Sequence, residues 1–468
     1  MRINTIRNRE LLRRIVRYDV NSSSNSIMRR FFCILASAVA LVASAAGLSD
    51  SNSLPDRQID SLLTSHKLVY IDGRPADADT QQYVDSIRRK ISEFYYDQFR
   101  AFSDPAAPYF MFLSKDASLA MGIGGAVRMR AYYDWGGAMP TSAFVPYLIP
   151  MHPSPVSMRH LGTTPAGTCL YFKVFGRNKM LGDYQLYIEG NFSGYESRDF
   201  KIKKAYAIVN DFTVGYASST FSDPAALPPI VDAQGPNNKI APTSVLVRYM
   251  PVVRDKWVFA ASVEMPSSAV DADNDATQAV DNWMPDFAAF AQYQWARGQH
   301  VRLSGVVRTL SYRDVAAATN HNIAGWGLQL SSVAHPAAPV TTYATLNYGH
   351  GYAGLGGDLM MGRYDLVGDP AKPGKMYAPA SFGWCLGVQY NIRPNLFVSA
   401  SASATRYLPS HEVAPDEYKR GMFGAVNVFW NLTPRMQVAA ELDLGMRRNF
   451  SGEHRYARRA GLMCMFSF

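Results

Sequence analysis

The feature that most constrains the fold is a long stretch, Leu119–Trp135, in which two kinds of residue alternate. Its odd positions are apolar or glycine, whereas its even positions are small or polar and include Arg128 and Arg130. A period of two is the pattern of a β-strand. The stretch is longer than the roughly 3–10 residues usual for a strand. It instead suits a transmembrane barrel strand, in which about 9–11 residues face lipid and lumen in turn.

The same alternation recurs through the rest of the chain. A soluble β-sandwich also alternates, but its shorter strands share one dry core. We therefore predict an all-β fold, a 16-stranded antiparallel transmembrane β-barrel over residues 117–468. The predicted strands are 118–135, 168–177, 183–192, 199–209, 211–219, 243–253, 256–265, 286–296, 300–312, 322–333, 339–349, 381–392, 395–406, 419–431, 435–447 and 456–468.

The connections between these strands are of two kinds. Every second one is short, whereas the others tend to be long and rich in Pro, Gly and Asp, notably 136–167, 220–242, 266–285 and 351–380. Short turns on one rim and long loops on the other are typical of outer-membrane barrels, with the short turns in the periplasm. Aromatic residues on the apolar face lie beside the short turns, where an interfacial girdle is expected: Phe212, Trp257, Trp295, Tyr390, Trp430 and Phe468.

The chain begins with an expected leader and signal peptide over residues 1–46. Arg29 and Arg30 precede the apolar run Phe31–Val42, and Ala43–Ala45 resembles a cleavage site. A membrane-spanning helix is the weaker interpretation because the run is shorter than about 20 residues. The first 45 residues also carry +6 of the net charge of +9. The basic balance therefore belongs mostly to the leader and does not indicate a nucleic-acid partner.

Residues 47–116 are expected to form a periplasmic helical segment and linker, with helices over Leu54–Leu63 and Thr80–Phe102. Within the second helix, apolar residues follow one another at steps of three and four, the a/d spacing of a coiled coil. They are Val84, Ile87, Ile91 and Phe94. Two interpretations remain open: an oligomer seam, or an amphipathic helix docked on its own domain.

Neither a metal nor a cofactor is expected, and the sequence contains no enzyme motif in a suitable structural context. The three cysteines after the leader, Cys169, Cys385 and Cys464, are widely spaced, and the histidines show no paired metal spacing. Glu441 and Asp443 lie two residues apart on a lumen face, which is one arrangement for acid/base work. A pore-lining role is the commoner one for such a pair, and no nucleophilic partner is evident.

The predicted lumen is basic even though the chain after its leader is nearly neutral. Sorting charges by strand parity puts about twice as many cations as carboxylates on the polar faces. Such a lumen favours small anionic solutes over cations, and we expect Arg128, Arg130, Lys203 and Arg248 to contact solute. The full set of expected pore residues is Arg128, Arg130, Lys173, Arg177, Lys201, Lys203, Arg248, Arg302 and Arg308.

One region resembles a known family. Lys203–Tyr206, Val214–Pro224, Leu227–Pro228, Asp232, Gly235–Asn237 and Val247–Tyr249 form a strand, loop and strand similar to that of the DcaP-like outer-membrane porins. The resemblance implies a homotrimeric porin with a periplasmic coiled-coil extension, taking up small anions such as dicarboxylates. It also implies that the 220–242 loop folds inward, with Phe221, Asp223, Asp232 and Asn237 as its constriction residues. The chain departs from the family in its 110–115 linker and its 136–167 loop.

These observations predict a diffusion porin in the lipid bilayer of the bacterial outer membrane, preferring small anions such as dicarboxylates. A phosphate- or oxyanion-selective porin is the nearest alternative. A structural or adhesive barrel with a closed lumen is another, and zero conductance would distinguish it. A barrel hydrolase would need a nucleophile and a base at the lipid face or the upper rim.

Overall fold

The structure is a computed structural model that describes residues 68–73, 80–95, 97–105, 108, 110–116, 118–180, 182–193, 199–253, 256–272 and 275–468. The predicted leader and signal peptide, and the predicted helix over Leu54–Leu63, lie outside these residues. Among the described residues, no helix is both long and apolar enough to cross a membrane.

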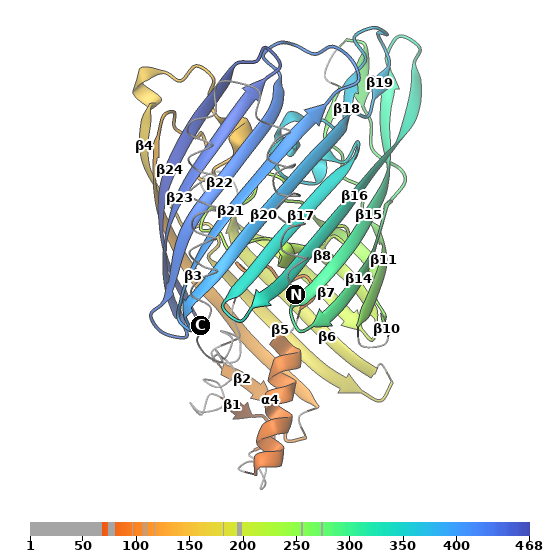
Figure 1. Ribbon diagram of the computed structural model, residues 1–468. Coiled ribbons are helices and arrows are strands. Elements are labelled where there is room, and N and C mark those ends of the chain that lie inside the picture. Colours follow the sequence, from red (N-terminus) through yellow and green to blue (C-terminus); the bar gives the residue numbers. More distant parts are fainter. Residues whose placement is uncertain are drawn as a thin grey trace, which may run out of the picture. The chain divides into compact units, whose positions relative to one another are not determined.

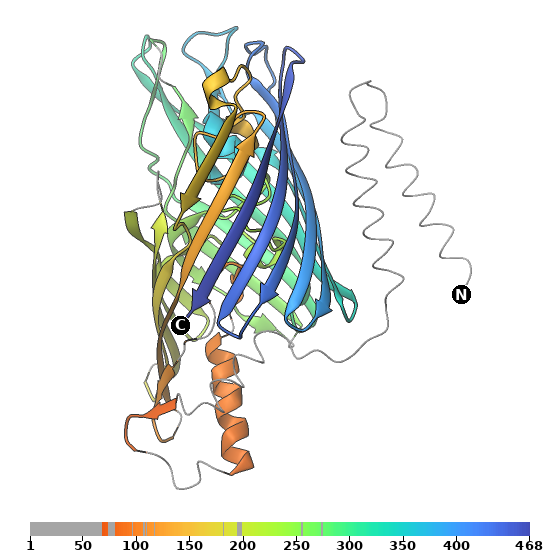
Figure 2. The ribbon, with the colours of Figure 1, turned by 90° about the vertical axis from the view of Figure 1, so that its left-hand side faces the viewer.

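Sixteen antiparallel strands form the wall of a closed barrel, as predicted (Figure 1). Closure comes from β24 pairing with β3, with Arg458 opposite Trp135 and Ser467 opposite Ala126. Figure 2 shows β3 in orange beside β24 in dark blue. The wall strands are β3 (Leu119–Trp135), β5 (Cys169–Asn178), β6 (Gly182–Ser193), β7 (Asp199–Val209), β8 (Phe212–Ser218), β9 (Thr243–Tyr249), β11 (Trp257–Glu264), β14 (Asp286–Ala296), β15 (Gln299–Asp314), β16 (Thr319–Ala337), β17 (Val340–His350), β20 (Ala380–Arg393), β21 (Leu396–Leu408), β22 (Tyr418–Asn431), β23 (Met436–Asn449) and β24 (His454–Ser467).

The wall turns its apolar side chains outward. In β11, the apolar residues Trp257, Phe259 and Val263 are exposed on the outer face. The polar residues Ser262 and Glu264, which flank Val263 in the sequence, are buried on the lumen side. Exposed aromatic residues also lie next to the short turns, as expected for a girdle: Phe212, Trp257, Trp295 and Trp430. An apolar outer face around a polar interior fits a barrel surrounded by lipid.

The long connections contain more regular structure than the sequence predicts. β4 (Arg159–Thr164) pairs with the far half of β3, and β13 (Thr277–Ala279) pairs with β15. Such short strands carry too few alternating residues to be recognised. The remaining elements are β10 (Val252–Val253), the small sheet of β12 (Val270–Asp271), β18 (Leu366–Gly368) and β19 (Met376–Tyr377), and the 3-10 helices η1 (Pro146–Leu148), η2 (Pro155–Ser157), η3 (Pro224–Ala226), η4 (Ala353–Leu355) and η5 (Asp358–Gly362).

Before the barrel, α4 (Gln81–Tyr95) packs on two short strands, β1 (Leu68–Tyr70) and β2 (Phe110–Leu113). Strand β2 pairs with β3, so part of the expected linker extends the sheet. Ile87 and Ile91 are fully buried in this cluster, in contact with their own chain. Val84 is partly exposed, and the side chain of Phe94 lies outside those described. The helix also ends at Tyr95, seven residues before the predicted Phe102.

Candidate functional site

The 220–242 loop lies inside the barrel and reaches the opposite wall. It leaves β8 and returns into β9, the fifth and sixth wall strands. At its tip, Val231 and Asp232 donate their backbone N–H groups to the two carboxylate oxygens of Glu441, each over 2.7 Å. Glu441 belongs to β23, the fifteenth wall strand. A buried carboxylate on the wall therefore holds the loop tip through two charge-assisted hydrogen bonds.

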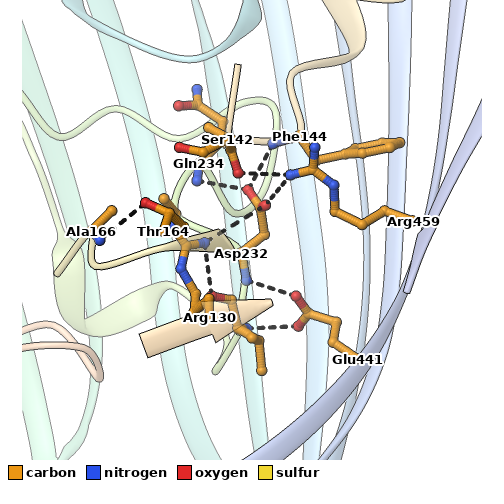
Figure 3. A network of polar contacts seen from close by, with 12 residues as sticks. Arg130, Ser142, Phe144, Thr164, Ala166, Asp232, Gln234, Glu441 and Arg459 are labelled. Carbon is orange, nitrogen blue, oxygen red and sulfur yellow. Dashed lines mark hydrogen bonds and ion pairs between the residues drawn. The ribbon is translucent and has the colours of Figure 1, made fainter. Parts of the chain in front are cut away.

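Asp232 is the centre of a polar network that joins the loop to β3 and β24 (Figure 3). Its carboxylate accepts from Arg459 Nη1 over 3.0 Å and from the Phe144 backbone over 3.0 Å, and Arg130 Nη1 lies 3.8 Å away. Arg459 also donates to both oxygens of Asp134, over 2.6 and 2.9 Å. Burial alone would raise the pKa of Asp232, but the guanidinium groups of Arg459 and Arg130 lower it below its ordinary value.

The first part of the loop is fixed to the other side of the barrel. The Asp223 carboxylate lies 2.9 Å from His300 Nε2 and 3.5 Å from Arg302 Nη1, and it accepts from the Ser331 hydroxyl over 2.5 Å. Burial would raise the pKa of Asp223, but the charge of Arg302 and the hydrogen bond from His300 lower it. Phe221 is fully buried beside them. The loop is therefore held in its first part as well as at its tip.

The last part of the loop contacts a second long connection. The Asn237 backbone donates to Ser403 Oγ on β21 over 3.1 Å, and Asn237 Nδ2 donates to Asp358 Oδ2 over 3.1 Å. Tyr418 donates to the same Asp358 oxygen over 2.9 Å. Burial raises the pKa of Asp358, which begins η5, to about 7. Of the expected constriction residues, Asp223, Asp232 and Asn237 form hydrogen bonds with residues of the wall strands, and Phe221 is buried.

Four of the expected pore cations donate to backbone carbonyl oxygens, three of them in the loop and one at the strand end before it. Arg128 and Arg130, both on β3, donate to the Val231 carbonyl oxygen over 2.9 and 3.3 Å. Arg302 donates to the Ser222 carbonyl oxygen near the start of the loop, and Arg248 donates to the Ser218 carbonyl oxygen at the end of β8, each over 3.0 Å. These guanidinium groups are buried inside the barrel, and part of their hydrogen-bonding capacity is used by the loop backbone and by the end of β8.

Other expected pore residues lie elsewhere. Arg177 and Lys201 are exposed at the two ends of the wall and form ion pairs with Asp183 and Asp199. Lys173 is buried on β5. The structure does not bring these three residues together with the loop tip.

Arg308 is completely buried on β15 between two carboxylates. It donates over 3.0 Å to Asp286 on β14 and over 3.0 Å to Asp365 in the 351–380 connection. A guanidinium matched by two carboxylates adds no net positive charge to the lumen. Its position indicates that it fixes the 351–380 connection to the wall.

Residues 97–105 also enter the barrel, at the rim that carries the short turns. Phe99 packs against Phe290 of β14, with ring centroids 6.1 Å apart. Phe102 packs against Phe397 of β21 and Phe429 of β22, with centroid distances of 5.7 and 5.2 Å. These strands are the eighth, thirteenth and fourteenth of the wall. The segment therefore extends across the lumen.

Asp104, at the end of this segment, is bound by two lysines of β7. Its carboxylate accepts from Lys203 Nζ over 2.8 Å and from Lys204 Nζ over 3.3 Å. Lys203 also donates to Glu189 over 2.9 Å. Burial would raise the pKa of Asp104, but the charges of Lys203 and Lys204 lower it well below its ordinary range.

Strand parity missed Lys204 because of an irregularity in the wall. Lys204 pairs with Glu189, whereas the next pair along is Gly190 with Ile202, so Lys203 is an extra residue between them. A bulge of this kind interrupts the alternation of side chains. It brings both lysines to the lumen, whereas regular alternation would send one of them to lipid. No signal in the sequence locates the bulge.

A cavity of about 210 Å³ lies between the 97–105 segment and the 220–242 loop. Its lining is partly apolar, with Phe99, Phe102, Leu227 and Ile230 among the residues. Lys239 belongs to it, and burial lowers the pKa of this lysine. The charged residues of the lining are Arg128, Lys203, Lys204, Lys239, Asp104 and Asp232.

The described residues contain no group of three or more His, Cys, Asp or Glu side chains arranged to hold a metal ion. Of the two carboxylates considered for acid/base work, Glu441 is occupied by the loop tip and by Asn427, which donates to it over 2.9 Å. Asp443 is buried two residues further along β23. Their geometry indicates an anchoring role for Glu441.

Comparison with known proteins supports the fold. No protein-family model and no curated protein sequence matches the chain. Among solved structures, the outer membrane channel DcaP of Acinetobacter baumannii is similar with a TM-score of 0.62 and 19% identity, over 75% of this chain and 98% of that one. A loop-deletion mutant of OmpT, an outer membrane protein of Vibrio cholerae, is similar with a TM-score of 0.50 and 9% identity, over 75% of this chain and 100% of that one.

The likeness to DcaP confirms, for the fold, the resemblance seen in the sequence. Both chains form barrels of the kind found in outer membranes, and the apolar outer face of this one requires lipid around it. The chain is therefore a β-barrel of the bacterial outer membrane with the fold of the channel DcaP.

Proposed function

We propose that the protein is a diffusion porin for small solutes, preferentially anions such as dicarboxylates. The observation that carries the proposal is the lumen cavity of about 210 Å³, whose lining contains four cationic side chains and two carboxylates. Sites for drug-sized ligands usually measure about 300–1,000 Å³, so this cavity suits smaller molecules. Its excess of positive charge favours anions.

Electrostatics explains why such a cavity selects by charge. Low-dielectric walls focus the field of clustered cations and raise the local concentration of anions. Lysine ammonium and arginine guanidinium groups bind carboxylates through charge-assisted hydrogen bonds. The same groups bind phosphate and other oxyanions, so an oxyanion-selective porin stays the nearest alternative. Uptake of succinate compared with inorganic phosphate into proteoliposomes distinguishes the two.

A separate observation favours a second function, a structural barrel with a closed lumen. The 220–242 loop and the 97–105 segment both cross the interior, and each is fixed to opposite parts of the wall. Planar-bilayer conductance near zero in every salt would support this function over transport. Measurable current through the purified protein would reject it.

Neutralising Lys239 tests the proposed solute preference. Because Lys239 contributes one of the four cations of the cavity, Lys239→Gln should lower the succinate flux into proteoliposomes by a factor of about 2–5, which corresponds to the roughly 0.2–1 kcal/mol of a solvent-exposed ion pair. Lys372→Gln, which removes a lysine exposed in the 351–380 connection, is the matched control and should leave the flux unchanged. Equal fluxes for Lys239→Gln and the unmodified protein would count against the cavity as the solute path.

We further propose that the protein is a homotrimer, as the DcaP-like resemblance implies, with α4 in the periplasm. Ile87→Asp with Ile91→Asp tests whether α4 contributes to assembly. If these residues form a seam, the oligomer should weaken on native gels while the barrel folds. If they only dock α4 on β2, as their contacts with Met111 and Leu113 favour, the oligomer should persist and α4 should become sensitive to protease. Asp85→Asn, on the same helix, is the control.

A further inference from the structure

The carboxylate of Asp104 is bound by two lysines at the lumen cavity. It borders the lumen cavity together with the two lysines that hold it, at 2.8 Å from Lys203 Nζ and 3.3 Å from Lys204 Nζ. Its side chain is only about one-tenth exposed. A charged side chain of the chain itself thus occupies the part of the cavity that carries these two lysines.

The charges at this corner balance only when Asp104 is present. Lys203 also contacts Glu189, whose second oxygen accepts from the Tyr187 hydroxyl over 2.9 Å. The two ammonium groups are therefore matched by the carboxylates of Glu189 and Asp104. Withdrawing Asp104 would leave two cations facing one anion in a buried place, which is unfavourable unless another anion replaces it.

The segment that carries Asp104 is attached by side chains. Residues 97–105 contain neither helix nor strand, so no ladder of backbone hydrogen bonds joins them to the wall. Phe99 lies under the Arg248 guanidinium, 3.9 Å from its ring centroid, and the Gln98 carbonyl oxygen accepts from Arg302 Nη2 over 3.4 Å. Contacts of this kind separate individually, whereas a paired strand separates only as a whole.

We infer that Lys203 and Lys204 form a carboxylate-binding subsite, that Asp104 fills it as an internal ligand, and that a solute carboxylate displaces Asp104 and releases residues 97–105 from the lumen. The inference rests on the proposed function and adds the binding subsite and its regulation. Asp104 and the solute carboxylate compete for the same ammonium groups. Apparent affinity for solute is therefore reduced by the fraction of molecules in which Asp104 occupies the subsite.

Asp104→Asn removes the internal competitor and keeps the shape of the side chain. In the full-length protein, succinate binding measured by calorimetry should tighten by about tenfold, because the subsite is then free in a larger fraction of molecules. Single-channel conductance without succinate should also rise, since the segment loses its ion pairs. Asp199→Asn removes an exposed carboxylate on the same strand as the lysines and is the matched control. It should change neither quantity.

Lys204→Gln gives a second, independent measurement. It should weaken succinate binding in the Asp104→Asn background, because it removes one of the two ammonium groups of the subsite. Unchanged or weaker succinate binding by folded Asp104→Asn would overturn the inference, as would unchanged succinate binding after Lys204→Gln is added to Asp104→Asn. Neither result would contradict the proposed function. That function is rejected separately if the unmodified protein conducts no current or prefers cations.

Discussion

Deleting Ala225–Pro236 is expected to raise the single-channel conductance by a factor of about 2–5, because these residues lie inside the lumen and the width of the constriction limits the current. The deletion removes the tip that Glu441 holds through two backbone hydrogen bonds. It also removes the carbonyl oxygen of Val231, to which Arg128 and Arg130 donate. Both arginines should then face open water. Planar-bilayer recording of single insertion events measures the change.

The control shortens a connection that does not enter the barrel. Ala316 and Ala317 are exposed in the turn between β15 and β16, and their deletion should leave the conductance as it is. Circular dichroism should show the same strand content in all three proteins. An unchanged conductance after loss of Ala225–Pro236 would mean that current flows by a path that the loop does not restrict.

Arg459→Met is expected to be the most destabilising single substitution in the lumen. Arg459 is almost fully buried and donates to the carboxylates of Asp134 and Asp232 at 2.6–3.0 Å. Methionine fills the space but leaves two buried carboxylates without this partner. Removing one member of a buried ion pair typically costs about 3–5 kcal/mol in the free energy of unfolding. Denaturant unfolding of the purified barrel, followed by tryptophan fluorescence, measures the loss.

The loss should depend on pH in a defined direction. The folded-state pKa of Asp232 is lowered, chiefly by Arg459 and then by Arg130, against the opposing effect of burial. The stabilisation is therefore fully present above the unfolded-state pKa of about 4, and it disappears as the pH falls through the lower folded-state value. The difference between Arg459→Met and the unmodified protein should accordingly be larger at pH 7 than in acid. Arg458→Met, at the neighbouring position on the other face of β24, serves as control; equal losses at both positions would argue against the network.

The wall of the barrel was predictable because every wall strand repeats one simple physical requirement. Lipid on one side and water on the other impose a period of two, which Leu119–Trp135 follows along its whole length. Strand parity missed Lys204, because the backbone departs from that period at the bulge where Lys203 is an extra residue. A bulge depends on the local pairing of two strands, which the alternation within one strand does not reveal.

The contents of the lumen were harder to predict. Only the resemblance to the DcaP-like porins placed Asp232 and Asn237 in an inward loop. No pattern in the sequence identified the loop tip as the partner of Glu441, because the two are more than 200 residues apart in the chain. The helix was predicted to run to Phe102, whereas α4 ends at Tyr95 and Phe102 packs inside the barrel. An apolar residue at helical spacing is equally suited to a helix seam and to a lumen contact. Tertiary contacts decide between them.

The reversal potential of the unmodified protein in a salt gradient tests the central claim most directly. A lumen lined by Arg128, Lys203, Lys204 and Lys239 should give a reversal potential of the sign for anion preference. The preference should weaken as the ionic strength rises, because salt screens the lumen charges over about 10 Å at 0.1 M and about 3 Å at 1 M. Cation preference, or the absence of current in every salt, would contradict the account.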